Sequence, residues 1–223
     1  MCGFMSDMTG TKATALETWC QKHDKSFLRF DYRGHGHSSG EFSDGTIGMW
    51  TDDAVFAIEN LTTGPQILVG SSMGGWIMLL AALRLKKRIA GLLGLAAAPD
   101  FTEELIHKEL KEEHLAILNR DGFISLPGDY GDEPYIITKK LIEDGRHNMV
   151  LNGTIELDVP VRLIQGMNDA DVPWASALKI QEKLRTNDVE VTLVKNGDHR
   201  LSEPEDLDRL TRTLEQLINQ ISS

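Results

Sequence analysis

The stretch Gln66-Ile67-Leu68-Val69-Gly70-Ser71-Ser72-Met73-Gly74-Gly75-Trp76 decides the fold of this chain. Its first part is an apolar run, its middle is a G-x-S-x-G motif, and the apolar pattern that follows has the length of a helix. A strand, a sharp turn and a helix in this order place the central serine in a strained turn above a sheet. We therefore predict that Ser72 is an exposed nucleophile. Ser71 is the competing candidate, but only Ser72 is centred between Gly70 and Gly74.

Strand and helix patterns alternate on both sides of this motif. Short apolar runs, typical of strands that are buried on both faces of a parallel sheet, occupy residues 26–31, 66–70, 89–96, 161–166 and 189–194. Helical patterns occupy residues 11–23, 46–61, 74–85, 174–186 and 204–221. The alternation predicts an α/β fold with a mostly parallel central sheet flanked by helices.

Residues 99–158 interrupt this alternation. Two helical segments, 101–120 and 134–144, flank a turn-rich stretch that begins at Leu126-Pro127-Gly128. About sixty residues are too many for an ordinary connection between two strands. We interpret 99–158 as a small helical cap over the carboxyl edge of the sheet, inserted in a single domain that comprises residues 1–223.

Candidate partners of the serine follow the last two predicted strands. A serine nucleophile needs a base, usually a histidine, which a carboxylate orients. Asp169 comes after the fourth strand in the chain outside the cap, and His199 comes after the fifth. Because parallel strands end at one edge of a sheet, both side chains should reach the edge that carries Ser72. We predict Ser72, Asp169 and His199 as a catalytic triad.

Other titratable residues compete for these roles. Asp171 and Asp198 are alternatives for the carboxylate, although Asp171 also suits the cap of the following helix. The segment His35-Gly36-His37 resembles half of a metal site, but no third ligand at metal-binding spacing accompanies it. We interpret this segment as a tight turn after a strand, and we predict neither a metal site nor a cofactor.

Composition narrows the class of protein. The 223 residues include 23 Lys and Arg and 34 Asp and Glu, a net charge of −11, which argues against a general nucleic-acid-binding surface. The most apolar stretches fall well short of the roughly 20 residues that span a bilayer. Two cysteines, Cys2 and Cys20, are too few for a disulfide framework, so a reducing, intracellular setting is expected.

The segment from Gly3 to Lys12 precedes the first predicted helix, where the loop of an oxyanion hole is expected. The backbone N–H of Met73 is predicted as one donor, because it lies at the start of the helix after Ser72. We predict the N–H of Phe4 as the second donor, with Met5 as the next choice.

Together these motifs resemble the α/β-hydrolase superfamily, and more narrowly the family of the mitochondrial palmitoyl-protein thioesterase and acyl-glucuronide esterase with its bacterial homologues. The resemblance is carried by residues 3–13, 29–38 and 64–76, and by Gly166-Met167-Asn168-Asp169, Val172-Pro173-Trp174 and Asp198-His199-Arg200. It implies that Ser72 is the nucleophile, Asp169 the orienting acid and His199 the general base. Members of this family have two or three strands before the position of Gly3, so we expect the N-terminal strands of the sheet to be missing here.

The resemblance implies a serine hydrolase that cleaves carboxylic esters or thioesters through an acyl-enzyme, with a small-molecule or protein-linked acyl substrate. The implied location is the cytoplasm of a bacterium, or a mitochondrion for a eukaryotic chain. Two alternatives are a non-catalytic protein of the same fold that binds a ligand or partner, and a peptidase or C–C hydrolase with the same triad. The apolar cap residues either line an acyl pocket or form the inner face of the cap helices: Ile106, Leu110, Leu115, Ile117, Leu118 and Phe123.

Overall fold

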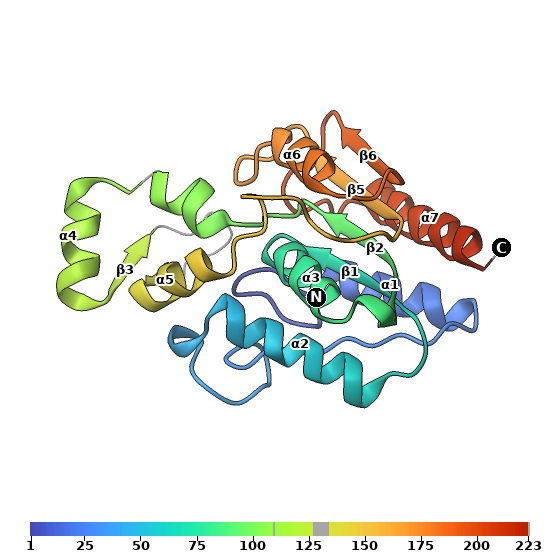
Figure 1. Ribbon diagram of the computed structural model, residues 1–223, viewed down its shortest axis with the longest axis horizontal. Helices are drawn as coiled ribbons and strands as arrows, with labels where there is room; N and C mark the ends of the chain where they lie inside the picture. The colour runs from blue at the N-terminus through green and yellow to red at the C-terminus, as the bar shows by residue number, and fades with distance from the viewer. Residues whose placement is uncertain (109, 127–133, 223) are drawn as a thin grey trace.

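Four parallel strands form the central sheet of the computed structural model, which describes residues 1–108, 110–126 and 134–222 (Figure 1). The strand order is β1-β2-β5-β6, with bounds Gln66–Ser71, Ile89–Leu95, Val161–Gly166 and Val189–Val194. All four agree with the predicted strands to within one residue. Because the strands are parallel, their carboxyl ends meet at a single edge of the sheet.

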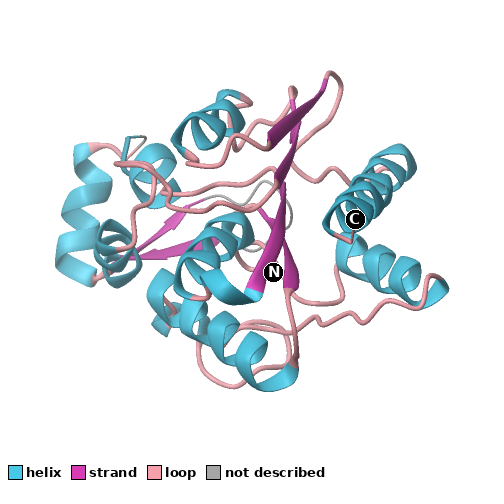
Figure 2. Cartoon of the chain, turned by 45° about the vertical axis from the view of Figure 1, so that its right-hand side comes forward, coloured by secondary structure: helices cyan, strands magenta, loops and turns pink. Residues whose placement is uncertain are grey.

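Helices cover both faces of this sheet, as predicted (Figure 2). On one face lie α1 (Thr11–Lys22) and α7 (Pro204–Ile221), and on the other lie α2 (Ile47–Leu61), α3 (Met73–Arg84) and α6 (Ala175–Lys183). Each face has its own apolar core. Leu210, Leu214 and Leu217 of α7 pack with Leu93 and Leu95 of β2 on one side. Trp50 of α2 and Trp76 of α3, both fully buried, belong to the larger core on the other side.

The prediction of a strand at residues 26–31 is wrong. This segment lies outside regular secondary structure, and the free side of β1 is contacted instead by Met1, whose nitrogen donates to Val69 O at 2.9 Å and whose carbonyl accepts from Ser71 N at 3.2 Å. A strand exists only where a neighbour completes the ladder of hydrogen bonds. In the described part of the chain no strand pairs with residues 26–31, so the apolar pattern alone does not make them a strand.

The insertion after β2 also differs from its prediction. The first predicted helix is divided into η3 (Thr102–His107) and α4 (Glu112–Asp121), and the second begins only at Lys139, as α5 (Lys139–His147). Between α4 and α5 lies an antiparallel pair, β3 (Phe123–Leu126) and β4 (Tyr135–Thr138). The β-branched residues of β4 favour a strand, and the Thr138 side chain caps α5 by accepting from Leu141 N. The turn predicted around residues 127–133 lies outside the described residues.

These elements project to one side of the sheet, beyond β2, in Figure 1. A small apolar cluster holds them together: Leu118, Ile124, Ile137 and Ile142 are all buried. Short helical turns, η1 (Phe42–Asp44) and η2 (Lys86–Arg88), complete the described elements. Among the described helices, none has both the length and the apolar character to cross a membrane.

Candidate active site

Ser72 occupies a strained turn between β1 and α3. Its φ is 55° and its ψ is −124°, a conformation that non-glycine residues rarely adopt. Three backbone hydrogen bonds hold it there: its N–H donates to Leu95 O at 3.0 Å, and its carbonyl accepts from Gly75 N at 2.8 Å and Ala98 N at 3.1 Å. The turn therefore presents the Ser72 hydroxyl at the carboxyl edge of the sheet, because its backbone is tied to the neighbouring strand.

Glycines allow this turn to be so tight. A Cβ on Gly70 would lie 2.3 Å from the carbonyl oxygen of Gly74, and one on Gly75 would lie 2.5 Å from the Cβ of Ala97. Both distances are far below van der Waals contact. The G-x-S-x-G spacing is thus a steric requirement for strand and helix to approach each other here.

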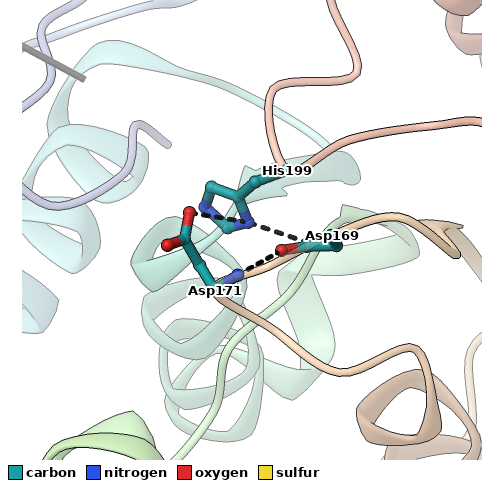
Figure 3. A group of neighbouring side chains, drawn as sticks. All are labelled: Asp169, Asp171 and His199. Carbon is teal, nitrogen blue, oxygen red and sulfur yellow. Dashed lines mark hydrogen bonds and ion pairs between the residues drawn. The ribbon is translucent and has the colours of Figure 1, made fainter. Parts of the chain in front are cut away.

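His199 connects the serine to a carboxylate. Its Nε2 lies 3.1 Å from Ser72 Oγ. Its Nδ1 lies 2.9 Å from Asp169 Oδ2, on the side that Figure 3 shows. Asp169 lies in the loop after β5 and His199 in the loop after β6, so the parallel sheet brings together three residues spread over 127 positions. The structure thus unites the three side chains that the sequence predicted as a triad.

Asp169 is fixed from several directions. Its side chain is fully buried, and its Oδ1 accepts from the N–H groups of Asp171 at 2.9 Å and Val172 at 2.8 Å. Burial disfavours the charged form, but the hydrogen bonds from His199, Val172 and Asp171 outweigh it, so the pKa of Asp169 is lowered. A carboxylate that stays ionised suits the orientation of an imidazole and the stabilisation of an imidazolium.

The competing candidates lie farther from the reacting atoms. The carboxylate of Asp171 is 3.9 Å from His199 Nδ1, a full ångström more than that of Asp169. Asp198 instead accepts from Leu201 N at 2.9 Å. Ser71 is the last residue of β1, and its N–H donates to Met1 O. Of these candidates, the described contacts join only Ser72 and Asp169 to the two ring nitrogens of His199 within hydrogen-bond distance.

Gln165 is a further residue of this site, and the sequence analysis did not identify it. Its Nε2 donates to Asp169 Oδ2 at 2.8 Å and to Val172 O at 3.1 Å, so it supports the same carboxylate oxygen that faces His199. The sequence contains a signal that could have identified Gln165 as a site residue. Gln165 is a polar residue at the end of an otherwise largely apolar, fully buried strand, four positions before the candidate acid.

The predicted oxyanion donors lie next to Ser72. A Cβ on Gly3 would be 3.3 Å from Ser72 Cβ and 3.8 Å from its Oγ, so Gly3, which directly precedes Phe4, lies beside the hydroxyl. Met73 is the first residue of α3, and the first N–H groups of a helix have no partner within it. The role of the Met73 and Phe4 N–H groups as oxyanion donors stays a prediction.

The segment that contains His35 forms the turn that was predicted. Gly34 and Gly36 have φ values of 75° and 50°, which glycine adopts without strain. His35 is buried among aromatic rings, 5.1 Å from Phe42 and 5.0 Å from Trp50 between centroids, and this burial lowers the pKa of its imidazole.

In the described part of the chain, three potential metal ligands meet only at one place, where two members of the candidate triad lie beside Asp171. Asp169, Asp171 and His199 each offer an atom within 4.8 Å of the others (Figure 3). Donors from the protein already engage both oxygens of Asp169. This donor set favours a carboxylate that orients His199 over one that binds a metal ion.

A cavity of about 1340 Å³ adjoins Ser72 and His199. It extends along β1 and under the inserted segment 99–158, where its apolar lining consists of Phe4, Phe101, Ile106, Leu110, Leu126, Tyr135 and Ile137. Two of the six predicted cap residues, Ile106 and Leu110, line it. Leu118 is buried in the cap's own apolar cluster, whereas Ile117 and Phe123 are exposed.

Comparison with known proteins gives relatives over the whole length of this chain. A family model described as serine aminopeptidase, S33, matches residues 9–120. The mitochondrial palmitoyl-protein thioesterase ABHD10 of Pongo abelii is 38% identical over 225 residues, which cover 99% of this chain and 72% of the relative.

Solved structures agree with these sequence matches. A protein from Agrobacterium vitis S4, assigned as a hydrolase, is 43% identical with a TM-score of 0.95 over 97% of this chain and 85% of that one. The alpha/beta hydrolase domain-containing protein 10 from mouse is 36% identical with a TM-score of 0.92, over 99% of this chain and 88% of that one. The chain therefore belongs to the α/β-hydrolase family that includes the mitochondrial palmitoyl-protein thioesterase ABHD10.

Proposed function

We propose that this protein is a serine hydrolase that cleaves acyl esters or thioesters through Ser72, His199 and Asp169. The observation that carries the proposal is the continuous line of hydrogen bonds from Ser72 Oγ through both ring nitrogens of His199 to Asp169, at the wall of a partly apolar cavity. The named relatives support the thioesterase activity.

The geometry defines a reaction in two halves. His199 Nε2 takes the proton of Ser72 as Oγ attacks the acyl carbonyl, while Asp169 holds Nδ1 and stabilises the imidazolium. The N–H groups of Met73 and Phe4 stabilise the oxyanion. His199 then gives its proton to the leaving alcohol or thiol, and an acyl-enzyme remains on Ser72. Water, activated by His199, repeats the sequence and releases the acid.

We assign the acyl group to the cavity under residues 99–158, which act as a cap within a single domain. Apolar residues from both the cap and the main body line this part of the cavity, and an alkyl chain buried there gains about 0.8 kcal/mol per methylene. The ABHD10 relatives are named as mitochondrial proteins and the relative from Agrobacterium vitis is bacterial, so we propose a mitochondrial location, or the cytoplasm of a bacterium, for this chain.

Labelling with a fluorophosphonate probe tests the proposal. The wild-type protein should be labelled on Ser72, and the label should be absent from Ser72→Ala. The matched control is Ser71→Ala, which removes the neighbouring hydroxyl and should retain labelling. If the wild-type protein is well folded but is not labelled, the result would instead support a non-catalytic protein of this fold that binds a ligand or partner.

A peptidase is the second candidate function, because the matching family model is described as a serine aminopeptidase. An amide nitrogen is a poorer leaving group than a thiolate or phenolate, so the same triad requires additional contacts to protonate it. Rates on p-nitrophenyl octanoate, octanoyl-coenzyme A and alanine p-nitroanilide separate the classes. We expect hydrolysis of the first two, and turnover of the anilide alone would reverse the assignment.

A further inference from the structure

Phe4 occupies a position that its backbone role does not explain. Its N–H is one of the two proposed oxyanion donors, and it lies at the tip of a turn closed by a hydrogen bond from Ser6 N to Gly3 O at 3.2 Å. The loop is anchored on both sides of this tip. Met1 bonds to β1, and Met8 N donates to Asp31 Oδ1 at 2.7 Å.

The tip itself has no such anchor. In the described part of the chain, the N–H and carbonyl groups of Phe4 and Met5 make no hydrogen bond to the protein, and Met5 has a φ of 53°. An oxyanion donor must nevertheless be held within a fraction of an ångström, because its contribution depends on preorganisation. The side chain of Phe4 is the remaining means of fixing its position.

The ring of Phe4 lies between the main body and the cap. Its centroid is 4.8 Å from that of Phe42 and 6.2 Å from that of Trp50, which belong to η1 and α2. On the other side it is 5.8 Å from Phe101 and 6.1 Å from Tyr135, which lie at the base of the cap and on β4. Most of these contacts are edge-to-face pairs, each worth a fraction of a kcal/mol or more beyond area burial. Phe4 also packs against both the main core and the cap cluster.

We infer that the Phe4 side chain is a positioning residue: clamped between Phe42 and Trp50 of the main body and Phe101 and Tyr135 of the cap, it sets the place of its own N–H in the oxyanion hole. The seating of the cap is thereby coupled to transition-state stabilisation at Ser72. This inference rests on the proposed function, since it assumes that the oxyanion forms on an acyl group attacked by Ser72.

Phe4→Leu tests the inference, because leucine keeps the N–H and an apolar side chain but loses the ring contacts. With p-nitrophenyl acetate, whose acyl group has a single methyl to bury, kcat should fall about 10-fold while KM changes less than about 3-fold. The inhibition constant of methylboronic acid, whose serine adduct is tetrahedral, should rise by a similar factor. The inhibition constant of acetate should stay unchanged.

A matched control is Phe56→Leu, a substitution of the same kind on the exposed side of α2, where Phe56 is 65% exposed. It should leave kcat and the boronate constant unchanged. Phe101→Leu removes one of the two ring contacts between Phe4 and the cap. In the double variant Phe4→Leu/Phe101→Leu, kcat and the affinity for methylboronic acid should fall no further than in Phe4→Leu alone. Additive losses would show that Phe4 does not act through Phe101 and would overturn the coupling to the cap.

Unchanged kcat and boronate affinity in Phe4→Leu, with wild-type labelling of Ser72, would overturn this inference and leave the proposed function intact. Absence of labelling in the wild type would overturn both. If Phe4→Leu does not fold, Tyr135→Leu removes a cap contact while retaining Phe4. This variant should bind methylboronic acid more weakly than the wild type and bind acetate equally well. Equal affinities of the two proteins for methylboronic acid would contradict the inference.

Discussion

At the residue scale, the main feature is the strain in Ser72. A non-glycine residue at φ 55° and ψ −124° costs on the order of 1–3 kcal/mol. Hydrogen bonds to Leu95, Ala98 and Gly75 offset this cost, and they come from two different elements that the sheet has already fixed. The serine is therefore held in place by the fold rather than by its own conformational preference.

Asp169 and Asp171 are two neighbouring carboxylates with different expected roles. Asp169→Asn should lower kcat by roughly 10⁴-fold at neutral pH, since the amide reverses the tautomer that the imidazole needs. Asp171→Asn is the matched control, and it should change kcat by less than about 10-fold because its carboxylate is 3.9 Å from Nδ1. Steady-state kinetics on a p-nitrophenyl ester measure both. Equal losses in the two variants would contradict the assignment of Asp169.

The lowered pKa of Asp169 predicts a dependence of stability on pH. Hydrogen bonds from His199, Val172 and Asp171 outweigh the desolvation of the carboxylate, so its pKa in the folded state lies below the ordinary value of 3.8. The charged form therefore stabilises the fold above pH 3.8, and this contribution is lost as the pH falls through the folded pKa.

Urea unfolding of the wild type and of Asp169→Asn between pH 2.5 and 7 measures this effect. As the pH is lowered below about 4, the free energy of unfolding of the wild type should fall relative to that of Asp169→Asn. A difference that is the same at every pH would show that Asp169 titrates alike in the folded and unfolded chain.

At the scale of elements, Asp100 connects the beginning of the inserted segment 99–158 to residues near its end. It lies just after β2, is fully buried with a φ of 59°, and its oxygens accept from Val150 N and Leu151 N at 2.8 Å each. Residues that are about fifty positions apart are thereby held together, one just after β2 and the others after α5. The sequence offered only Pro99-Asp100 at the predicted boundary as a signal for this contact.

Asp100→Ala should lower the free energy of unfolding by about 2–4 kcal/mol, because two buried N–H groups lose their acceptor. Asp100→Asn keeps one acceptor oxygen and should lose less. Asp121→Ala is a control on the exposed end of α4, where Arg120 is the one ion-pair partner of Asp121 among the described residues. It should change stability by less than about 0.5 kcal/mol. Chemical denaturation gives the three values, and equal stabilities for Asp100→Ala and Asp121→Ala would contradict the proposed contact.

At the scale of the whole molecule, β2 and β5 are central strands and β1 is an edge strand in the described part of the chain. Ser71 N points away from β2, towards Met1. Because successive N–H groups of a strand alternate in direction, those of Ile67 and Val69 point to the same free side, and those of Leu68 and Gly70 point to β2.

Amide exchange followed by NMR should reflect this edge. The N–H groups of Ile67 and Val69 should exchange about 100-fold faster than those of Leu68 and Gly70, and the amides of β2 and β5 should be among the slowest. Equal protection on both sides of β1 would mean that the free side is covered in solution.

Much of this molecule was determined by its sequence alone. The four sheet strands, the five flanking helices and the elbow at Ser72 follow from patterns that are local: apolar runs, helical spacing, and glycines where a Cβ would collide with the backbone. The triad candidates also followed, since residues after parallel strands share an edge.

Tertiary structure decided what depends on distant neighbours. The position of the loop after β5 placed the carboxylate of Asp169, rather than that of Asp171, within hydrogen-bond distance of His199 Nδ1, whereas Asp198 accepts from Leu201 N.

The predictions from sequence that were wrong or incomplete have the same physical cause. Residues 26–31 have the pattern of a strand, but no strand among the described residues pairs with them, whereas β4 is a strand because β3 lies beside it. Gln165, which was not predicted, and the ring contacts of Phe4 depend on residues that the chain alone does not bring near. Local preference is a property of a segment, whereas hydrogen-bond ladders and ring packing exist only between segments that the fold has brought together.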